Sequence, residues 1–460
     1  MLRTTSAQQI SNLTLNFKSH FRKNIKLAYP VMLSQAGQIL VGVADSIMVG
    51  QTGTVPLAAV SFSNSVFVVL LTFGIGIAMA LTPLVAEADG KRDELRVAAL
   101  LKNGLWVISL IGILLTVCGF LILQKLEWFE QPAEVLELSV NYFSILSLSL
   151  LPAMIFQAGK QVVDGLSHTK QSMLISLTAN LVNVVLNYIL IYGHLGFSPL
   201  GIDGAGYATL ISRILMTLLM MDFVFRSKRL KISHFFHQAK TSRVIIRRIL
   251  SLGIPSGLQV LFEVGAFSFG GIMCGWLGSE ALAAHQIAAN ISSLTYMMAS
   301  GIGVAATIRV GNFLGKKDFQ DMRRAGYSSI MLATGLMMLC GLALVIFSQH
   351  IPALYVDDPK VISMAASLLL ICAIFQISDG VQVSTVSSLR GLQDVKIPSL
   401  YILTAYWVMG LPIGYILAFK MHLGVSGIWI GFVIGLTVIA ALAVFRFHRL
   451  SRLEPKSQNE

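Results

Sequence analysis

Charged residues are scarce in this sequence, where Asp, Glu, Lys and Arg make up only 12% of 460 residues. A soluble protein carries about 25% of such residues. Here 55% of the residues are hydrophobic and the mean hydropathy is +0.75. A soluble core cannot bury that much apolar surface, whereas a lipid bilayer can. The shortage of charge therefore argues against a soluble protein and predicts an integral membrane protein.

Cysteine is also rare, and motifs for cofactors are missing. All four cysteines lie inside apolar runs, where they act as small hydrophobic residues and form no disulfide framework. The His and Cys residues show no metal-binding spacing. The stretch at 311–317 is one residue too short for a P-loop and lacks Ser or Thr after its lysine. We therefore expect no cofactor, no bound nucleotide and no ATP-driven pumping.

Twelve apolar stretches are long enough to cross about 30 Å of hydrocarbon. They predict an all-α polytopic membrane protein with twelve transmembrane helices. The predicted spans are 25–49, 57–82, 98–122, 136–157, 172–193 and 204–225 in the first half, and 249–275, 281–305, 327–348, 361–386, 398–419 and 425–446 in the second.

Lysine and arginine alternate between successive loops. Lys125, Lys360 and Lys420 lie on one side and Arg213 lies within a span, while all other Lys and Arg fall on the opposite side. This second set includes Arg309 and Arg390, which we place in loops. By the positive-inside rule, the basic side is cytoplasmic. We predict a multi-pass protein of the cell inner membrane with both termini in the cytoplasm. The net charge of +12 then reflects topology, and no nucleic acid partner is needed.

The two halves of the sequence resemble each other, which predicts a duplication. Six spans in each half give both halves the same orientation, as in the parallel repeats of secondary transporters. The matching residues are Pro30 with Pro255, Leu57-Ala58-Ala59 with Leu282-Ala283-Ala284, Phe156-Gln157 with Phe375-Gln376, and Gly165-Leu166 with Gly391-Leu392.

The repeat and the loops predict the domain organisation. We expect an N-terminal cytoplasmic segment at 1–24, an N-lobe at 25–225, a basic inter-lobe loop at 226–248, a C-lobe at 249–446 and a cytoplasmic tail at 447–460.

Two acids interrupt apolar runs in the second half, Glu263 in 249–275 and Asp379 in 361–386. A carboxylate near the middle of a membrane costs about 2.5–3.5 kcal/mol, so it normally faces a partner, an ion or a water-filled cavity. The pair predicts a cation site, to which Tyr296 and Gln286 on a neighbouring span can contribute. The alternatives are a permanently protonated Glu263, a Tyr296 that anchors the interface and a Gln286 that bridges helices.

The first half offers a second set of polar residues. Asp45 lies late in the first span, and Asn183 and Asn187 are four residues apart on one face of the fifth. One carboxylate with amide oxygens suits a proton or a hard monovalent cation, although the amides could instead link helices. Arg213 is expected to neutralise an acid whose identity the sequence leaves open.

Four segments resemble the NorM-type members of the MATE (multidrug and toxic compound extrusion) family. They are 43–50, 257–269, 355–359 and 375–379, and the likeness extends from residue 26 to about 449. The resemblance implies a MATE fold, in which two six-helix bundles are related by pseudo-two-fold symmetry. It also implies antiport, in which organic cations and drugs leave in exchange for Na+ or H+.

The resemblance also implies roles for individual residues. Positions matching Glu263, Asp379 and Tyr296 are associated with the coupling cation, with Glu263 and Asp379 as ligands if it is Na+. Positions matching Asp45, Asn183 and Asn187 mark a first-lobe cation site. Asp358 and Gln286 match positions that line the drug cavity, although Asp358 in Asp357-Asp358-Pro359 also fits a turn or a helix N-cap. His285 and the stretch 380–382 have no clear match.

Three other functions compete with this interpretation. A flippase for a lipid-linked precursor would need cationic residues in its cavity, and only Arg213 is clearly within a span. An integral membrane enzyme would need His, acidic or nucleophilic residues clustered at one membrane surface, which we do not find. A scaffold would have no use for acids that cost stability. We therefore expect a transporter with small organic cations and membrane lipid as its partners, and nothing in the sequence requires more than a monomer.

Overall fold

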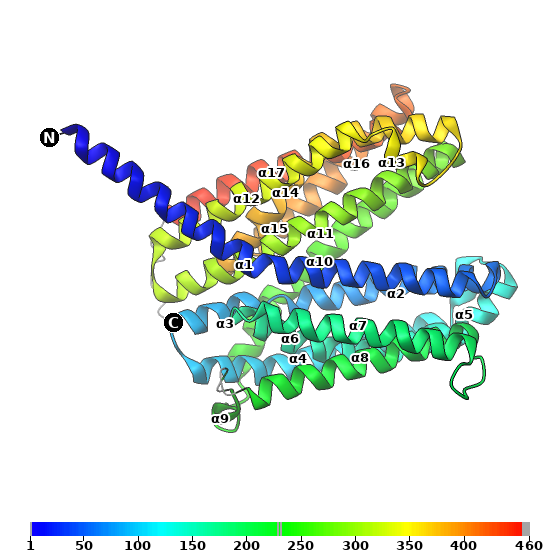
Figure 1. The fold of residues 1–460 in the computed structure, drawn as a ribbon, viewed down its shortest axis with the longest axis horizontal. Helices are drawn as coiled ribbons and strands as arrows, with labels where there is room; N and C mark the ends of the chain where they lie inside the picture. The colour runs from blue at the N-terminus through cyan, green and yellow to red at the C-terminus, as the bar shows by residue number, and fades with distance from the viewer. Residues whose placement is uncertain (1, 228–229, 231, 453–460) are drawn as a thin grey trace. The chain divides into compact units, whose positions relative to one another are not determined.

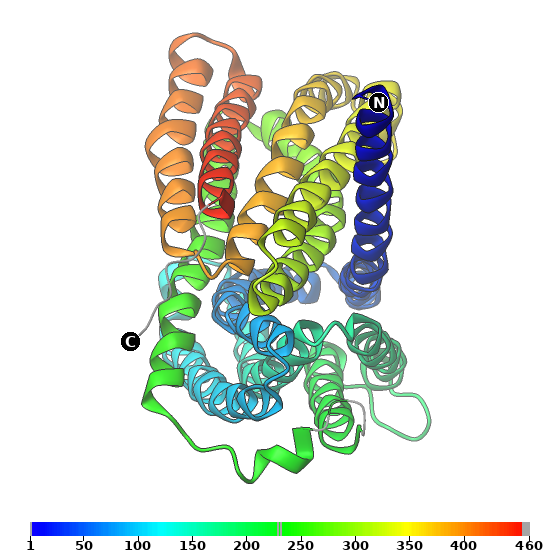
Figure 2. The ribbon, with the colours of Figure 1, turned by 90° about the vertical axis from the view of Figure 1, so that its left-hand side faces the viewer.

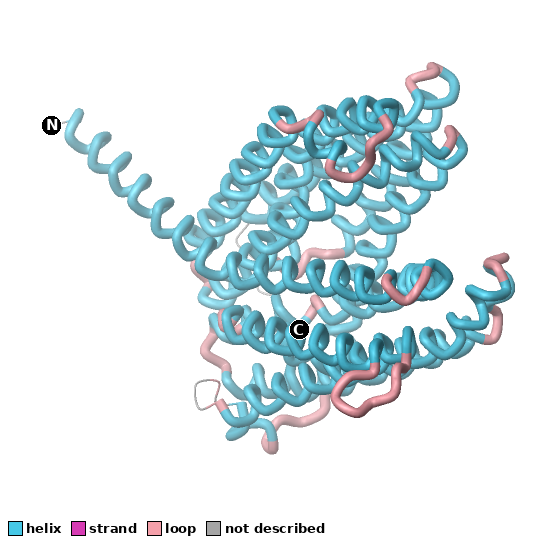
Figure 3. Tube along the Cα trace, turned by 45° about the vertical axis from the view of Figure 1, so that its right-hand side comes forward, coloured by secondary structure: helices cyan, strands magenta, loops and turns pink. Residues whose placement is uncertain are grey.

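A computed structural model describes residues 2–227, 230 and 232–452, with side chains from residue 17 onward except that of residue 233. Residues 453–460 of the predicted tail lie outside the described part. The described chain folds into helices joined by short loops (Figure 3). This follows from the composition, because lipid offers no hydrogen-bond partners and a helix satisfies its backbone groups internally.

In the described part of the chain, twelve helical segments are long and apolar enough to span a membrane, which confirms the predicted number. Each predicted span lies within the corresponding segment to within two residues. The helices of the first half are α1 (Leu2–Gly50), α2 (Thr54–Ala78), α3 (Leu81–Gly90), α4 (Glu94–Leu123), η1 (Leu126–Phe129), α5 (Ala133–Leu148), α6 (Leu150–Gly165), α7 (Thr169–Tyr192) and α8 (Gly201–Arg226).

The second half continues the series along the chain (Figure 1). Several of its helices are longer than the predicted spans, so that Arg309 and Arg390 lie within α11 and α14 and are each 6% exposed. Their assignment to loops was therefore wrong. The elements are α9 (Ile232–Phe236), α10 (Arg243–Trp276), α11 (Ser279–Lys316), α12 (Phe319–Ile346), α13 (His350–Ala353), α14 (Pro359–Gly391), α15 (Lys396–Leu403), η2 (Thr404–Gly410), α16 (Leu411–Tyr415), η3 (Ile416–Lys420) and α17 (Gly424–Arg452).

The chain divides into two compact units inside helices α1 and α10. The C-unit contains 1–32 and 258–460, and the N-unit contains 33–257. Each division falls two residues after a proline within the helix, Pro30 in α1 and Pro255 in α10. Proline removes a backbone donor and weakens helical continuity at that point. The loop at 226–248 lies within the N-unit, and the lobe boundaries placed there stay a prediction of the repeat.

The first part of α1 packs in the C-unit, where it runs beside α12 (Figure 2). Ala28 is buried with Ile302, Ala305 and Ala333. Gly301 approaches this part so closely that a Cβ would lie 3.1 Å from the backbone oxygen of Ala28. Small residues therefore let these helices approach closely, as is common in membranes.

The N-unit contains the equivalent arrangement, in which the first part of α10 packs on α2. A Cβ on Gly76 would lie 2.6 Å from the Cα of Gly257, and one on Gly253 would lie 2.8 Å from Ile77. These residues stand 225 positions from their counterparts in the C-unit, so Gly76 corresponds to Gly301. The two halves thus use the same close contact.

A second pair of equivalent contacts fixes the alignment of the repeats. Thr82 donates to the backbone oxygen of Gln161 (3.1 Å), and Thr307 donates to that of Ser387 (2.8 Å). Gly165 and Gly391 follow at the same distance in sequence, so the offset here is 226 residues. Phe156-Gln157 and Phe375-Gln376, which differ by 219, are therefore not equivalent. The predicted alignment of these two pairs was off by seven residues, which is nearly two helical turns. The misaligned residues therefore lie on the same face of the helix as the true equivalents, where similar residue types recur by chance.

An aromatic cluster holds α10 in the C-unit. The ring of Phe267 lies 4.7 Å from that of Phe432 and 6.0 Å from those of Phe375 and Tyr406, measured between centroids. These contacts join α10 to α14, α17 and η2, a short π-helical stretch. Glu263 is one turn before Phe267 and so lies on the same face of α10. The cluster therefore turns Glu263 toward the interior of the C-unit.

We predict that Gly391→Ala destabilises the protein by about 1–3 kcal/mol, because overpacking a tight contact forces the backbone to shift. The added Cβ would lie 2.8 Å from the Cβ of Val310 and 2.9 Å from the Thr307 oxygen. Thermal unfolding in detergent measures the effect. Gly335→Ala is the control, because nothing lies within 4 Å of its Cβ. An unchanged midpoint for Gly391→Ala would contradict the packing.

Candidate functional site

The polar site of the C-unit begins with Glu263 on α10, which accepts a hydrogen bond from Nε2 of Gln382 on α14 (3.0 Å). Asp379 lies three residues before Gln382 on α14, and residues at this spacing neighbour each other on a helix surface. Its side chain is buried, with 3% of the residue exposed, and it interacts electrostatically with Glu263. The structure thus brings together the two acids that the sequence pointed to.

Two tyrosines and one arginine complete this polar group. Tyr296 on α11 interacts electrostatically with Glu263, Asp379 and Arg390. Tyr406 on η2 is 1% exposed and interacts with Tyr296 and with both acids. Four elements of the C-unit, α10, α11, α14 and η2, therefore contribute to one buried cluster.

Several polar atoms in the cluster are buried without a hydrogen-bond partner in the described part of the chain. They are Asp379 Oδ2, Gln382 Oε1 and Arg390 Nε. Unpaired buried groups are costly and call for an explanation. Among the described residues, no group of three or more His, Cys, Asp or Glu side chains could hold a metal ion. Two carboxylates with neutral oxygens suit a proton or a hard monovalent cation better than a transition metal.

Sequence reasoning missed three members of the cluster. Gln382 could have been found, because it is three residues from Asp379 on the same helix. Arg390 was placed in a loop because basic residues are usually excluded from spans. Tyr406 lies in an aromatic stretch where nothing in the sequence distinguishes it from Tyr401 or Trp407.

Asp358 and Gln286 do not join this cluster. Asp358 is the exposed N-cap of α14 and accepts a hydrogen bond from the backbone of Lys360 (2.9 Å). It is separated from Asp379 by 21 residues, which is about 30 Å along a helix. Gln286 is exposed and donates to Asn290 (3.2 Å). A role for either residue in drug binding stays a prediction.

The N-unit holds the second predicted set, between α1 and α7. Nδ2 of Asn187 donates a hydrogen bond to the carboxylate of Asp45 and lies 3.3 Å from Oδ1 of Asn183. Asn187 is fully buried, and its Oδ1 has no partner in the part of the chain that the structure describes. The three residues therefore meet, and one amide oxygen is left available to a ligand.

Arg213 on α8 belongs to the same region. It interacts electrostatically with Asp45 and Tyr142, donates to Ser149 and lies over the ring of Phe67, 4.7 Å from its centroid. Asp45 is thus the acid that interacts electrostatically with Arg213, without forming an ion pair with it in the described part of the chain. Stacking on an aromatic ring adds a favourable cation–π contact.

Twelve candidate membrane spans among the described residues and an acidic polar site in each unit define the class, a polytopic membrane protein built like a secondary transporter. A family model described as MatE matches residues 30–189 and again 255–416, which is well over half of the chain. The chain therefore belongs to the MATE family of transporters. The two matched blocks begin 225 residues apart, at Pro30 and Pro255, which confirms the duplication.

Solved structures share the fold. The eukaryotic MATE transporter AtDTX14 is 21% identical, with a TM-score of 0.84 over 95% of this chain and 99% of that one. An outward-facing multidrug resistance MATE family transporter of the MOP superfamily is 23% identical, with a TM-score of 0.85 over 94% and 97%. A MOP superfamily transporter from Pyrococcus furiosus, for which a reversed binding-pocket polarity suggests a different function, is 22% identical, with a TM-score of 0.83 over 95% and 97%.

We predict that Asp45 and Arg213 are energetically coupled. Arg213→Met alone leaves the partly buried Asp45 without its compensating charge, which should cost less than the roughly 3–5 kcal/mol lost when a fully buried pair is broken. Adding Asp45→Asn should restore part of that loss, because the remaining groups are neutral. Thermal unfolding of the wild type, the two single variants and the double variant measures the coupling, and strictly additive losses would contradict it.

Proposed function

We propose that the protein is a NorM-type secondary active multidrug efflux transporter that exports organic cations in exchange for Na+ or H+. Glu263, Asp379 and Tyr296 act on the coupling cation, which Glu263 and Asp379 bind directly if it is Na+. Asp45, Asn183 and Asn187 form a further cation site in the N-unit. Asp358 and Gln286 contribute to drug binding.

The single observation that carries the proposal is the buried carboxylate of Asp379. One of its oxygens has no hydrogen-bond partner among the described residues, and a second carboxylate, Glu263, lies in electrostatic contact. Two acids that share a low-dielectric site repel each other. Binding a proton or a monovalent cation relieves this repulsion. The pair therefore stabilises the cation-loaded state more than the empty one.

Coupling follows if one site serves two cations in turn. When the ion is bound, the negative charge that attracts a cationic drug is neutralised, so the drug is released. When the ion leaves, the charge returns and the drug binds. A one-for-one exchange of a monovalent ion for a monocationic drug moves no net charge, so the concentration gradient of the ion drives that export. An exchange with a net inward movement of one positive charge through 100 mV would gain about 2.3 kcal/mol more, roughly a fiftyfold drug gradient.

We predict that Glu263→Gln and Asp379→Asn each abolish concentrative export. Each variant removes one of the two charges that the ion and the drug compete for. Ethidium efflux from vesicles measures export, with a Na+ gradient and a pH gradient imposed separately. The gradient that drives the wild type identifies the ion. Asp222→Asn is the control, because its carboxylate is exposed and pairs with Arg226 at the surface.

Wild-type export by both site variants would contradict the coupling role of the acids. The other candidate function is a flippase for a lipid-linked precursor, which would favour cationic residues for an anionic headgroup. In the structure, Arg309 and Arg390 also lie within candidate spans. Arg390 interacts electrostatically with Tyr296 and Glu263, and Arg309 donates hydrogen bonds to His20 and Asn24. Movement of such a lipid with no efflux of ethidium would favour the flippase.

We further propose that the protein lies in the cell inner membrane as a monomer with both termini in the cytoplasm. The alternation of basic loops supports this orientation. In a cysteine-free background, we expect Gln131→Cys to react with an impermeant maleimide in intact cells and Thr241→Cys only after permeabilisation. Both positions are exposed in the structure. The reverse pattern would contradict the orientation.

A further inference from the structure

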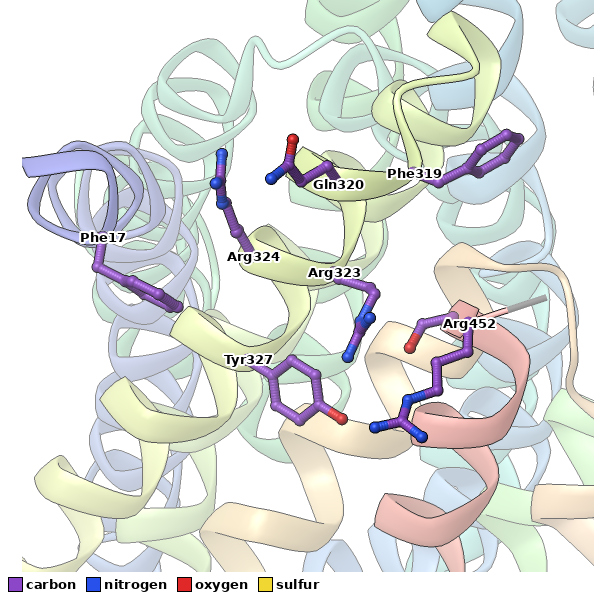
Figure 4. Close-up of a pocket in the computed structure, with 8 residues that line it drawn as sticks. Phe17, Phe319, Gln320, Arg323, Arg324, Tyr327 and Arg452 are labelled. Carbon is purple, nitrogen blue, oxygen red and sulfur yellow. The ribbon is translucent and has the colours of Figure 1, made fainter. Parts of the chain in front are cut away.

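A basic pocket of about 460 Å³ lies at the end of the C-unit where α12 begins and α17 ends (Figure 4). Arg323, Arg324 and Tyr327 line it from α12, Arg452 from α17 and Phe17 from α1. The proposed transport sites do not use any of these residues. The pocket therefore needs an explanation of its own.

Two of the three arginines of the pocket have no acidic partner among the described residues. In Figure 4, Arg323 and Arg452 extend toward the hydroxyl of Tyr327, which is held by Nδ1 of His448 (2.6 Å). Neither arginine forms an ion pair within the described residues, whereas Arg324 pairs with Asp321 (3.0 Å). Two like charges in one pocket repel each other unless an anion lies between them. Arginine is well suited to hold a phosphate, because its planar guanidinium offers several donors.

The fold itself does not require arginine at these positions. Offset by 225 residues, Arg323 and Arg324 correspond to Ala98 and Ala99 of the N-unit, which are buried. There the chain around α9 covers α4, and Lys102 donates to the backbone oxygen of Ala239 (2.8 Å). The chain of the N-unit therefore covers this place, whereas the described residues of the C-unit present cationic side chains there.

The position of the pocket indicates what kind of anion it meets. Helix α12 begins at Phe319 and helix α17 ends at Arg452. These candidate spans have 28 and 29 residues and are about 42–44 Å long, so we expect their ends at the level of the lipid headgroups. Met331 lies two turns from Arg324 on the same face of α12 and is 57% exposed. Phe445 lies two turns from Arg452 on the same face of α17 and is 68% exposed. Apolar surface thus continues from the pocket along both helices, where acyl chains can lie.

We propose that this pocket binds the phosphate headgroup of an anionic phospholipid between Arg323 and Arg452, with Tyr327 beside it. A soluble phosphate ester has the same chemistry, but a lipid is favoured because its acyl chains can cover Met331 and Phe445. Basic pockets at the ends of transmembrane helices are typical sites for such headgroups.

A headgroup in the site would also stabilise the part of α1 around Phe17 and His20. Phe17 lines the pocket, and Arg324 holds Asp321, whose carboxylate lies 3.7 Å from His20. His20 and Asn24 in turn bind the buried Arg309, and Asn24 donates to Ser328 (3.0 Å) and Ser329 (2.9 Å). A headgroup in the pocket therefore adds to the polar contacts that attach this part of α1 to α11 and α12.

The test is lipid binding to the purified full-length protein, measured by native mass spectrometry and thermal unfolding. The probes are phosphatidylglycerol, phosphatidylcholine and soluble glycerol phosphate. We expect the wild type to prefer phosphatidylglycerol and to be stabilised by it. Arg323→Gln with Arg452→Gln should weaken that binding about twenty-five-fold, at roughly fivefold per basic residue. The charge-preserving Arg323→Lys with Arg452→Lys should keep most of it.

The matched control is Arg243→Gln with Arg247→Gln, which removes the same charge from exposed arginines outside the pocket. It should bind phosphatidylglycerol like the wild type. Equal binding of phosphatidylcholine, an equal loss in the control variant, or no loss in either pocket variant would overturn the proposal. Equal stabilisation by glycerol phosphate would overturn the lipid as the occupant. None of these readouts depends on drug transport.

Discussion

Lipid gives polar groups no partners, and the structure of this protein follows from that constraint. Its backbone satisfies itself in helices, and its charges inside spans are met by other side chains. Arg213 interacts electrostatically with Asp45, and Arg309 forms hydrogen bonds with His20 and Asn24. Asp379 Oδ2 and Arg390 Nε are among the exceptions, because both atoms are buried with no hydrogen-bond partner among the described residues. An unpaired buried carboxylate costs stability, so we expect a transported cation to bind at Asp379.

The helices α1 and α10 have two roles in this arrangement. Each begins in one compact unit and ends in the other, and the chain passes between the units only at these two points. Close glycine contacts attach the first part of each helix, and a proline precedes each division. The later parts carry Asp45 and Glu263. The helices that join the units therefore also carry an acid of each proposed site.

The two halves share one backbone arrangement, but they carry different polar and charged residues at equivalent positions. The equivalent of Glu263 is Gln38, and that of Arg390 is Asp164, which pairs with Lys160 (2.8 Å). Two of the pocket arginines, Arg323 and Arg324, correspond to buried alanines, whereas Arg452 corresponds to Arg226. Backbone packing tolerates these exchanges because it depends on small residues at helix contacts, such as Gly165 and Gly391, and not on the polar side chains.

The sequence by itself determined the membrane class, the twelve spans, the duplication and one set of polar positions in each half. These follow from hydropathy, charge alternation and helical spacing, which are local properties of the sequence. It placed Arg309 and Arg390 in loops, because the alternation of basic residues between loops cannot show where a helix begins or ends. Tertiary structure alone decided that Gln382 and Tyr406 join Glu263, that Asp45 is the acid facing Arg213, and that Asp358 caps a helix far from Asp379. These are contacts between distant segments, and they depend on how the helices pack.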